Sequence, residues 1–243
     1  MIDYYEKILS GIDSQIKVDE IIYGISWTAA RLENGDVGVA MHTEGDTAKR
    51  MFKSLKGLTV EEASQAVMSW NMEEASEGQA VINAYYNTID NVTELGANSD
   101  ISGAMDNFDI DGKTICFVGH LVNHSGISEE LLAKSKEYFI LEREPKSGDL
   151  PDSACEYIIP KSDIVVITGS ANVNKTMPRL LELSEKAEVI ITGPTTTLCS
   201  GLEEFGVNRL YGVSITDPDG LAEVIVQKRT SVNKFSRRFC LDF

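Results

Sequence analysis

Apolar and polar positions along the first hundred residues follow a pattern that predicts a mixed α+β unit. Residues 3–12 have the spacing of a short helix, and residues 20–32 have the composition of one long strand. The dipeptide Asn34-Gly35 comes next and favours the positive φ angles of a tight hairpin. We therefore expect a returning strand over residues 37–41.

Two helix starts follow in the same unit. Thr59 with Glu62, and Asn71 with Glu74, have the spacing of capping boxes, in which two side chains bind the free backbone amides of a first turn. Each pair predicts a helix, and the second helix is expected to fade near residue 87.

The pattern changes after residues 96–111, a weakly patterned stretch rich in Gly, Asn and Asp. Beyond it, short apolar runs alternate with helical stretches. Strands are expected over 114–118, 138–141, 163–168, 188–192 and 209–215, and helices over 128–137, 152–158, 176–187, 198–205 and 218–227. Right-handed crossovers turn such a repeat into a parallel sheet covered on both faces. The sequence predicts an α/β protein: an α+β domain over 1–100 and a Rossmann-like, doubly wound domain over 108–243.

Ligands of open parallel sheets bind at the carboxyl ends of the strands, where the strand order reverses. The polar and glycine residues that follow the predicted strands are therefore the candidate ligand-binding residues. They are Gly119, His120, Glu142, Gly169, Ser170, Asn174, Thr176, Gly193, Pro194, Thr195 and Thr196. With the common order 3-2-1-4-5, Gly119-His120 would face Gly193-Pro194.

Two of these strand-end loops carry the strongest local signals. In residues 168–176, Gly169 allows close backbone approach, and Asn174 or Thr176 can cap the next helix. Residues 193–199 present three consecutive threonine hydroxyls before a predicted helix. Each loop by itself fits ordinary capping and turn chemistry equally well. The presence of both loops at neighbouring strand ends favours a binding site for a carboxylate or phosphate.

His120 is the candidate acid, base or metal ligand, because it directly follows the first strand. His124 and Cys199 could complete a soft-metal trio, although the spacing matches no zinc motif. Glu142 stands where nucleotide-binding folds place the acid that holds a ribose, or it could equally pair with Arg143 or Lys146 on the surface. No Gly-x-Gly-x-x-Gly opens the domain, so a standard NAD site is not expected.

One helix of the first unit carries a further candidate. Gln79, Asn83 and Asn87 follow one another at four-residue spacing and form a polar stripe on one face of the helix. The stripe, with Asn83 at its centre, could face a cleft, or it could be a solvated helix face. Trp27 is expected to be a core residue of its strand.

Charge narrows the partners. The chain has 38 acidic and 22 basic residues, for a formal net charge of −16, which repels nucleic acid and anionic lipid. A basic stretch near the carboxyl end is interpreted as a solvated or docked tail; its residues are Lys228, Arg229, Lys234, Arg237 and Arg238. No apolar run approaches the ~20 residues that span a bilayer, and the first residues lack a signal-peptide pattern. We expect a cytoplasmic protein with four reduced cysteines.

Several motifs together resemble the putative heavy-metal chelation domain family. They are residues 118–120 (Val-Gly-His), 148–151 (Gly-Asp-Leu-Pro), 168–170 (Thr-Gly-Ser), 173–176 (Val-Asn-Lys-Thr) and 193–196 (Gly-Pro-Thr-Thr), with the helix signature of residues 78–84. The resemblance implies an enolase-N-like domain packed on a Rossmann-like domain, with a site in the cleft between them. It implies no established reaction. The family's Ser and Pro in the last loop are Thr195 and Thr197 here.

The sequence leaves four functions open, of which a purely structural or interaction role is the last. The leading one is binding of an anionic or metal-chelating small molecule between the Asn174 and Thr195 loops, linked to heavy-metal handling. The second is an enzyme with a nucleotide-type cofactor, S-adenosylmethionine or NAD, and His120 as acid or base. The third is direct metal sequestration by His120, His124 and Cys199. The expected partner is a small molecule, with a second copy of the chain as an open alternative.

Overall fold

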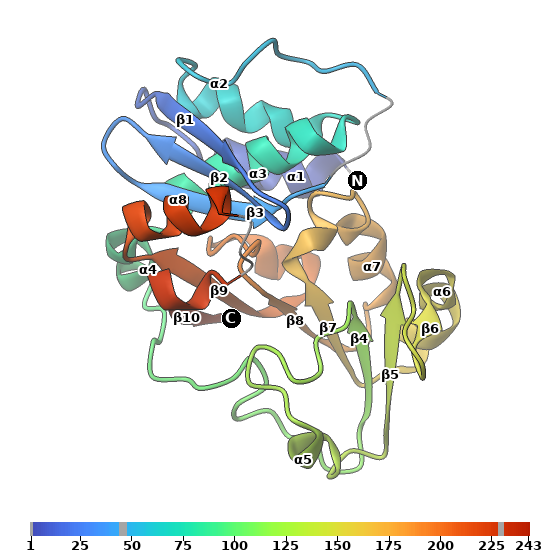
Figure 1. Ribbon diagram of the computed structural model, residues 1–243. Coiled ribbons are helices and arrows are strands. Elements are labelled where there is room, and N and C mark those ends of the chain that lie inside the picture. Colours follow the sequence, from blue (N-terminus) through green and yellow to red (C-terminus); the bar gives the residue numbers. More distant parts are fainter. Residues whose placement is uncertain (1, 44–47, 228–230) are drawn as a thin grey trace.

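The computed structural model describes residues 2–43, 48–227 and 231–243. It contains two β-sheets, and the smaller one lies across the strand ends of the larger one (Figure 1). A three-stranded antiparallel sheet with its helices lies over a seven-stranded, mostly parallel sheet (Figure 1). The parallel strands point their carboxyl ends towards the first sheet (Figure 1). The predicted mixed α/β class is confirmed.

The first sheet has the order β1-β2-β3. After helix α1 (Ile2–Ser10) come β1 (Val18–Tyr23), β2 (Trp27–Leu32) and β3 (Val37–Met41). The single long strand predicted over 20–32 is wrong, because the chain reverses after Gly24 and β1 pairs antiparallel with β2. A Cβ atom at Gly24 would lie 2.7 Å from the carbonyl oxygen of Ile225, so only glycine fits this turn.

Helices α2 (Val60–Ser64), α3 (Met72–Tyr86) and α4 (Ile89–Glu94) follow, with a 3-10 turn over Gln65–Met68. Both predicted starts are confirmed: the Thr59 hydroxyl accepts from the Glu62 amide, and the Asn71 side chain accepts from the Glu74 amide. Helix α3 packs on β2 and β3 and is buried from Glu74 to Ala84.

The second sheet has the order β10-β9-β8-β7-β4-β5-β6. Its strands are β4 (Thr114–Val118), β5 (Glu137–Glu142), β6 (Leu150–Pro151), β7 (Ile164–Thr168), β8 (Glu188–Thr192), β9 (Val207–Ile215) and β10 (Ser236–Asp242). All five predicted strands are present. Their order is 2-1-3-4-5 instead of 3-2-1-4-5, which moves the reversal point to the gap between β4 and β7.

Strand β10 corrects the interpretation of the basic carboxyl-terminal stretch. Arg237 and Arg238 are not in a tail but in an edge strand that pairs antiparallel with β9 over its whole length. Charged side chains are typical of edge strands, because they discourage pairing with another chain. Lys234 lies in the 3-10 turn Asn233–Phe235 before it, and Lys228 and Arg229 lie outside the described residues.

The helices beside the second sheet are shorter than predicted. They are α5 (Glu129–Leu132), α6 (Cys155–Ile158) and α7 (Met177–Leu183), with 3-10 turns over Asp152–Ala154, Ile159–Lys161, Gly169–Ala171 and Leu202–Phe205. One face of the sheet is covered by the stretch between the two units together with the segment from β4 to α5. Ala104, Met105 and Ile110 of that stretch are buried against Ile115 and Phe117 of β4. Residues 96–111 are therefore a packed cover rather than a simple linker.

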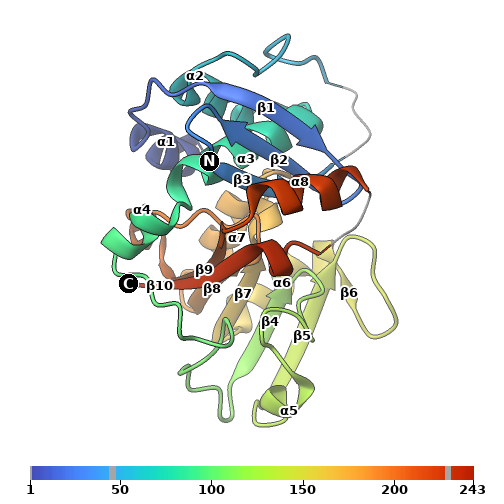
Figure 2. The same ribbon diagram turned by 60° about the vertical axis from the view of Figure 1, so that its left-hand side comes forward.

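Helix α8 (Pro218–Val226) joins the two units. It follows β9 but packs on β1 and β2 of the first sheet (Figure 2). Its residues Leu221 and Ile225 are buried with Ile22 of β1 and Val39 of β3. The largest core cluster also runs through both units. Burying apolar surface across this junction holds the first sheet in place over the strand ends. None of the helices in the described part of the chain is long and apolar enough to cross a membrane.

Candidate functional site

The carboxyl ends of β4 and β7 meet at the reversal point of the second sheet. Gly119 directly follows β4 with φ +102°, and a Cβ atom there would lie 3.1 Å from the methyl group of Thr168 on β7. The strand order assumed for the predicted pairing of Gly119-His120 with Gly193-Pro194 is wrong, because β7 stands between β4 and β8, but His120, Gly193 and Pro194 still line one cavity. His120 thus lies nearest the β7 loop.

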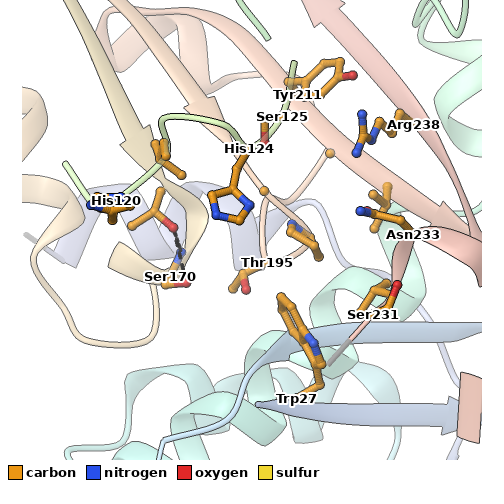
Figure 3. A pocket seen from close by; sticks show the side chains of 17 residues that line it. Trp27, His120, His124, Ser125, Ser170, Thr195, Tyr211, Ser231, Asn233 and Arg238 are labelled. Atoms are coloured by element: carbon orange, nitrogen blue, oxygen red, sulfur yellow. Dashed lines mark hydrogen bonds between the residues drawn. The ribbon is translucent and has the colours of Figure 1, made fainter. Parts of the chain in front are cut away.

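Two adjoining cavities open at this point, of about 450 and 480 Å³. His120, Leu121, Thr168 and Ser170 line both of them. The first cavity extends beneath the first sheet, with Trp27 of β2 on its wall (Figure 3). The second extends past β5; among its lining residues are Gly119, Glu142, Arg143, Asn174, Thr176 and Arg179. Both cavities lie at the strand ends, where the sequence predicts a ligand site.

His120 is held in one orientation from two sides. Its Nδ1 atom lies 3.1 Å from Oδ2 of Asp149, whose side chain is only 3% exposed. Its backbone amide donates to Glu142 at 3.0 Å, and Glu142 also accepts from the amide of Arg143 at 2.7 Å. The sequence suggested a ribose ligand or a surface ion pair for Glu142; in the structure its carboxylate secures the turn that carries His120.

Asp149 is a site residue that the sequence reasoning did not select, although its Gly-Asp-Leu-Pro motif was noted. Burial by itself would raise the pKa of its carboxyl group. The hydrogen bond from the amide of Lys146, at 2.9 Å, and the contact with His120 instead hold this pKa below its ordinary value. Asp149 is therefore a carboxylate at neutral pH, and it stabilises a hydrogen on Nδ1 of His120.

The β7 loop contributes Ser170 to both cavities. The Thr168 hydroxyl accepts from the Ser170 amide and donates to the Ser170 hydroxyl at 3.3 Å. Asn174 accepts from the amide and the hydroxyl of Thr176, which precedes α7. Gly169 lines neither cavity. A Cβ atom there would lie 2.6 Å from the amide nitrogen of Thr196, so the backbone at Gly169 packs directly against the loop after β8. Its close approach serves the neighbouring loop and not a ligand.

The threonine loop after β8 is used mainly to join the two units. The Thr195 hydroxyl accepts from the amide of Met41 at 2.9 Å. The Thr197 hydroxyl donates to Asn83 at 2.8 Å and accepts from Gln79 at 2.8 Å. Thr195, Thr196 and Thr197 are each no more than 1% exposed. Only Thr195 of the three lines a cavity, so the predicted hydroxyl cradle is not formed.

The polar stripe of α3 is the other half of this junction. Asn83 donates to the carbonyl oxygens of Val39 and Thr195, at 2.8 and 3.1 Å. Asn87 donates to Thr196 and accepts from the amide of Leu198, both at 2.8 Å. Asn83 is 1% exposed and lines neither cavity, so both its expected positions, in a cleft or in solvent, are wrong. It holds the threonine loop in place.

Several residues that the sequence analysis did not choose line the first cavity. Arg238 comes from β10, Trp27 from β2 and Tyr211 from β9 (Figure 3). Burial raises the pKa of Tyr211, while the neighbouring Arg238 guanidinium opposes that rise. These residues come from strands far apart in the sequence, and no local motif links them. Trp27, expected in the core, is a partly exposed cavity wall.

Lys175 is a second unselected residue, and it lies between the units rather than in a cavity. Its ammonium group donates to the carbonyl oxygens of Val67 and Val173, the second at 3.1 Å, and lies 5.6 Å from the centre of the Tyr5 ring. Burial lowers its pKa to about 8. A charged group kept at 9% exposure by these contacts ties the β7 loop to the first unit.

Metal-ligating side chains are not assembled at the site. His120 and His124 line the first cavity, but Cys199 is buried beside Tyr4 and lines neither cavity. Burial raises the pKa of Cys199 to about 12, which keeps it a thiol. Across residues 2–43, 48–227 and 231–243, no three His, Cys, Asp or Glu side chains could together hold a metal ion. The predicted trio is therefore not formed.

Comparisons with known proteins agree with this architecture. An uncharacterized protein of Methanocaldococcus jannaschii is 27% identical over 234 residues, which cover 88% of this chain and 84% of that protein. A crystal structure of a protein of unknown function from Desulfitobacterium hafniense has a TM-score of 0.85 and 32% identity, covering 99% of this chain and 97% of that one. One from Pyrococcus horikoshii, also of unknown function, has a TM-score of 0.75 and 21% identity, covering 98% of both chains.

Family models match both units. Residues 104–241 match one model and residues 5–86 match a second, and both carry the description putative heavy-metal chelation. The Desulfitobacterium hafniense protein is from the same family as the first of these models. The two matches and the full-length structural relative place the same two units in the same order. The chain therefore belongs to the putative heavy-metal chelation family.

Proposed function

We propose that this protein binds an anionic small molecule in the cleft between its two sheets. The observation that carries the proposal is the charge of the first cavity. None of the 17 described residues that line it is Asp or Glu, although the chain has 38 acidic residues. Arg238, His120 and His124 do line it, and an arginine stays charged at neutral pH. The local potential therefore favours an anion at the Arg238 end of the cavity, whereas Asp149 places a negative charge behind His120 at the other end.

The dimensions and walls support an organic anion rather than a bare inorganic ion. Each cavity lies within the range of about 300–1,000 Å³ that is usual for metabolite sites. Trp27 and Pro194 offer apolar surface, while Ser125, Ser170 and Asn233 offer hydrogen-bonding groups. A molecule with several carboxylates or a phosphate on a small carbon skeleton fits this mixture.

The family description supports a link to metal, but the donor set does not support a metal ion held by this chain alone. The described residues contain no group of three ligating side chains. The four cysteines are buried. We therefore propose binding of an organic anion as the primary activity, with any metal reaching the site together with such a molecule.

Titration calorimetry with citrate, nitrilotriacetate and inorganic phosphate tests the proposal, and native mass spectrometry of freshly purified protein shows any ligand carried along. We expect Arg238→Gln to weaken binding of the carboxylates about tenfold or more, the usual effect of a charged hydrogen bond. Arg237→Gln is the matched control, because it makes the same charge change on the exposed side of the same strand. Equal affinities of both variants and the wild type for these anions would overturn the proposal.

A further inference from the structure

The His120 imidazole contacts a carboxylate through one ring nitrogen and lines both cavities with the rest of its ring. Because a carboxylate only accepts hydrogen bonds, Nδ1 carries the hydrogen shared with Asp149, at 3.1 Å. That leaves Nε2 as the free nitrogen of a ring that lines both cavities and is 30% exposed. Histidines that bind metals almost always donate their other ring hydrogen to a carboxylate or carbonyl, which fixes the ring and makes the ligating nitrogen more basic.

The remaining coordination positions have no protein donor. Only His124 offers a second imidazole in the same cavity, and the described ranges contain no group of three metal-ligating side chains. Imidazole nitrogen suits divalent zinc, copper and nickel, but one or two imidazoles do not make a closed site. The other ligand atoms must therefore come from the bound molecule.

The cavity separates this nitrogen from the fixed positive charge. In Figure 3 His120 and Arg238 lie at opposite ends of the cavity, with His124 between them. A ligand that satisfied both ends would carry a group for the imidazole at one end and carboxylates for the guanidinium at the other. A metal ion wrapped by a polycarboxylate has this shape, because the ion can keep an open position while the free carboxylate oxygens point outward.

We infer that the cleft binds an anionic metal chelate, a divalent transition-metal ion already held by a polycarboxylate ligand, and that Nε2 of His120 fills an open coordination position of the metal. This inference rests on the proposed anion site and names its ligand class. The chain then recognises a complex instead of extracting a bare ion. Asp149 is a positioning residue, since it acts on the metal only through His120.

Three probes test the inference on the wild-type protein: nitrilotriacetate alone, its equimolar copper(II) complex, and copper(II) bound to ethylenediaminetetraacetate. The nitrilotriacetate complex keeps open copper positions, whereas the third probe leaves few. By calorimetry we expect the copper–nitrilotriacetate complex to bind about tenfold tighter or more than either other probe, as one added metal–imidazole bond with its supporting carboxylate would give. Its electron paramagnetic resonance spectrum should gain coupling to an imidazole nitrogen.

Substitutions test whether the nitrogen bound to copper belongs to His120. His120→Ala should lower the affinity for the copper complex to that for nitrilotriacetate alone and remove the nitrogen coupling. Asp149→Asn keeps the size of the side chain and should weaken the copper complex by about 10–100-fold, with a smaller effect on free nitrilotriacetate. His42→Ala is the control, because His42 lines neither cavity and its Nδ1 atom contacts the Thr28 hydroxyl at 2.9 Å.

The outcomes separate this inference from the proposed function. Equal binding of nitrilotriacetate with and without copper, both weakened in Arg238→Gln, overturns the inference and keeps the anion site. Coupling that persists in His120→Ala also overturns it, since another residue then binds the metal. Affinities unchanged in Arg238→Gln for every probe overturn the anion site itself. The comparison of the two copper complexes needs no variant, so it stands even if His120→Ala does not fold.

Discussion

The loop after β4 and the loop after β8 differ in a way that their sequences conceal. The threonine loop after β8 has the richer polar pattern. Its Thr195 and Thr197 hydroxyls, however, form hydrogen bonds with Met41, Gln79 and Asn83 of the other unit. The loop after β4 carries His120 and His124, which both line the first cavity, and the Nε2 atom of His120 is left free there. Polar residues at strand ends can hold domains together as readily as they can hold ligands, and only their partners distinguish the two roles.

The loops around the candidate site are each held by hydrogen bonds to neighbouring elements. The threonine loop is fixed by buried hydrogen bonds to α3, and the adjacent β7 loop is fixed by Lys175. His120 is fixed by Asp149 and Glu142. A preformed pocket loses little conformational entropy when a ligand binds, which favours affinity.

The largest expected effect is a loss of stability when the junction between the threonine loop and α3 is broken. Asn83→Leu leaves the carbonyl oxygens of Val39 and Thr195 and the hydroxyl of Thr197 without their amide partner. We expect the free energy of unfolding in urea to fall by about 3–5 kcal/mol, because buried polar groups left unpaired cost about 1–3 kcal/mol each. Gln15→Leu changes an exposed amide and should alter stability by about 0.5 kcal/mol or less. Similar losses for both variants would contradict this role of Asn83.

Lys175 gives a pH-dependent test of the same junction. Its pKa is about 8 in the folded protein and 10.5 ordinarily, so between these values the unfolded chain binds the extra proton. Stability from this group must therefore rise with pH across that window. Between about pH 7 and about pH 10, the unfolding free energy of the wild type should rise by about 2 kcal/mol relative to Lys175→Met. Parallel stability curves would show that Lys175 is not desolvated in this way.

The smallest effects contrast the two loops directly. Thr195→Val removes the acceptor of the Met41 amide and should cost about 1 kcal/mol of stability, with little change in nitrilotriacetate affinity. Ser170→Ala lies in both cavities and should do the reverse, with stability changed by about 0.5 kcal/mol or less and affinity reduced about three- to tenfold. Thermal unfolding and calorimetry on the two variants measure both quantities. A loss of affinity in Thr195→Val alone would reverse the assignment of the loops.

Much of the fold could be read from local patterns. The apolar runs predicted all five internal strands, and the capping pairs at Thr59 and Asn71 predicted the starts of α2 and α3. The patterns failed where packing decided the structure. The turn at Gly24 depends on the close approach of Ile225, 201 positions later in the chain, and β10 is a strand because β9 pairs with it.

The candidate site was only partly visible in the sequence. His120, Ser170 and Asn174 line the cavities, as a site at the strand ends required. Arg238 and Asp149 were not chosen, because the basic stretch and the Gly-Asp-Leu-Pro motif that contain them do not show what these side chains contact. Arg238 reaches the cavity only because β10 pairs beside β9, and Asp149 meets His120 only because β6 pairs beside β5.

The sequence by itself determined the local elements, the acidic charge and the chemical groups available at the strand ends, because these depend on a few neighbouring residues. The tertiary structure decided the strand order, and with it which loops meet. It also decided which hydroxyls and amides are consumed by hydrogen bonds across the junction, since a buried polar group must find a partner wherever the fold supplies one. After these hydrogen bonds are made, Nε2 of His120 and the guanidinium group of Arg238 still face the cleft.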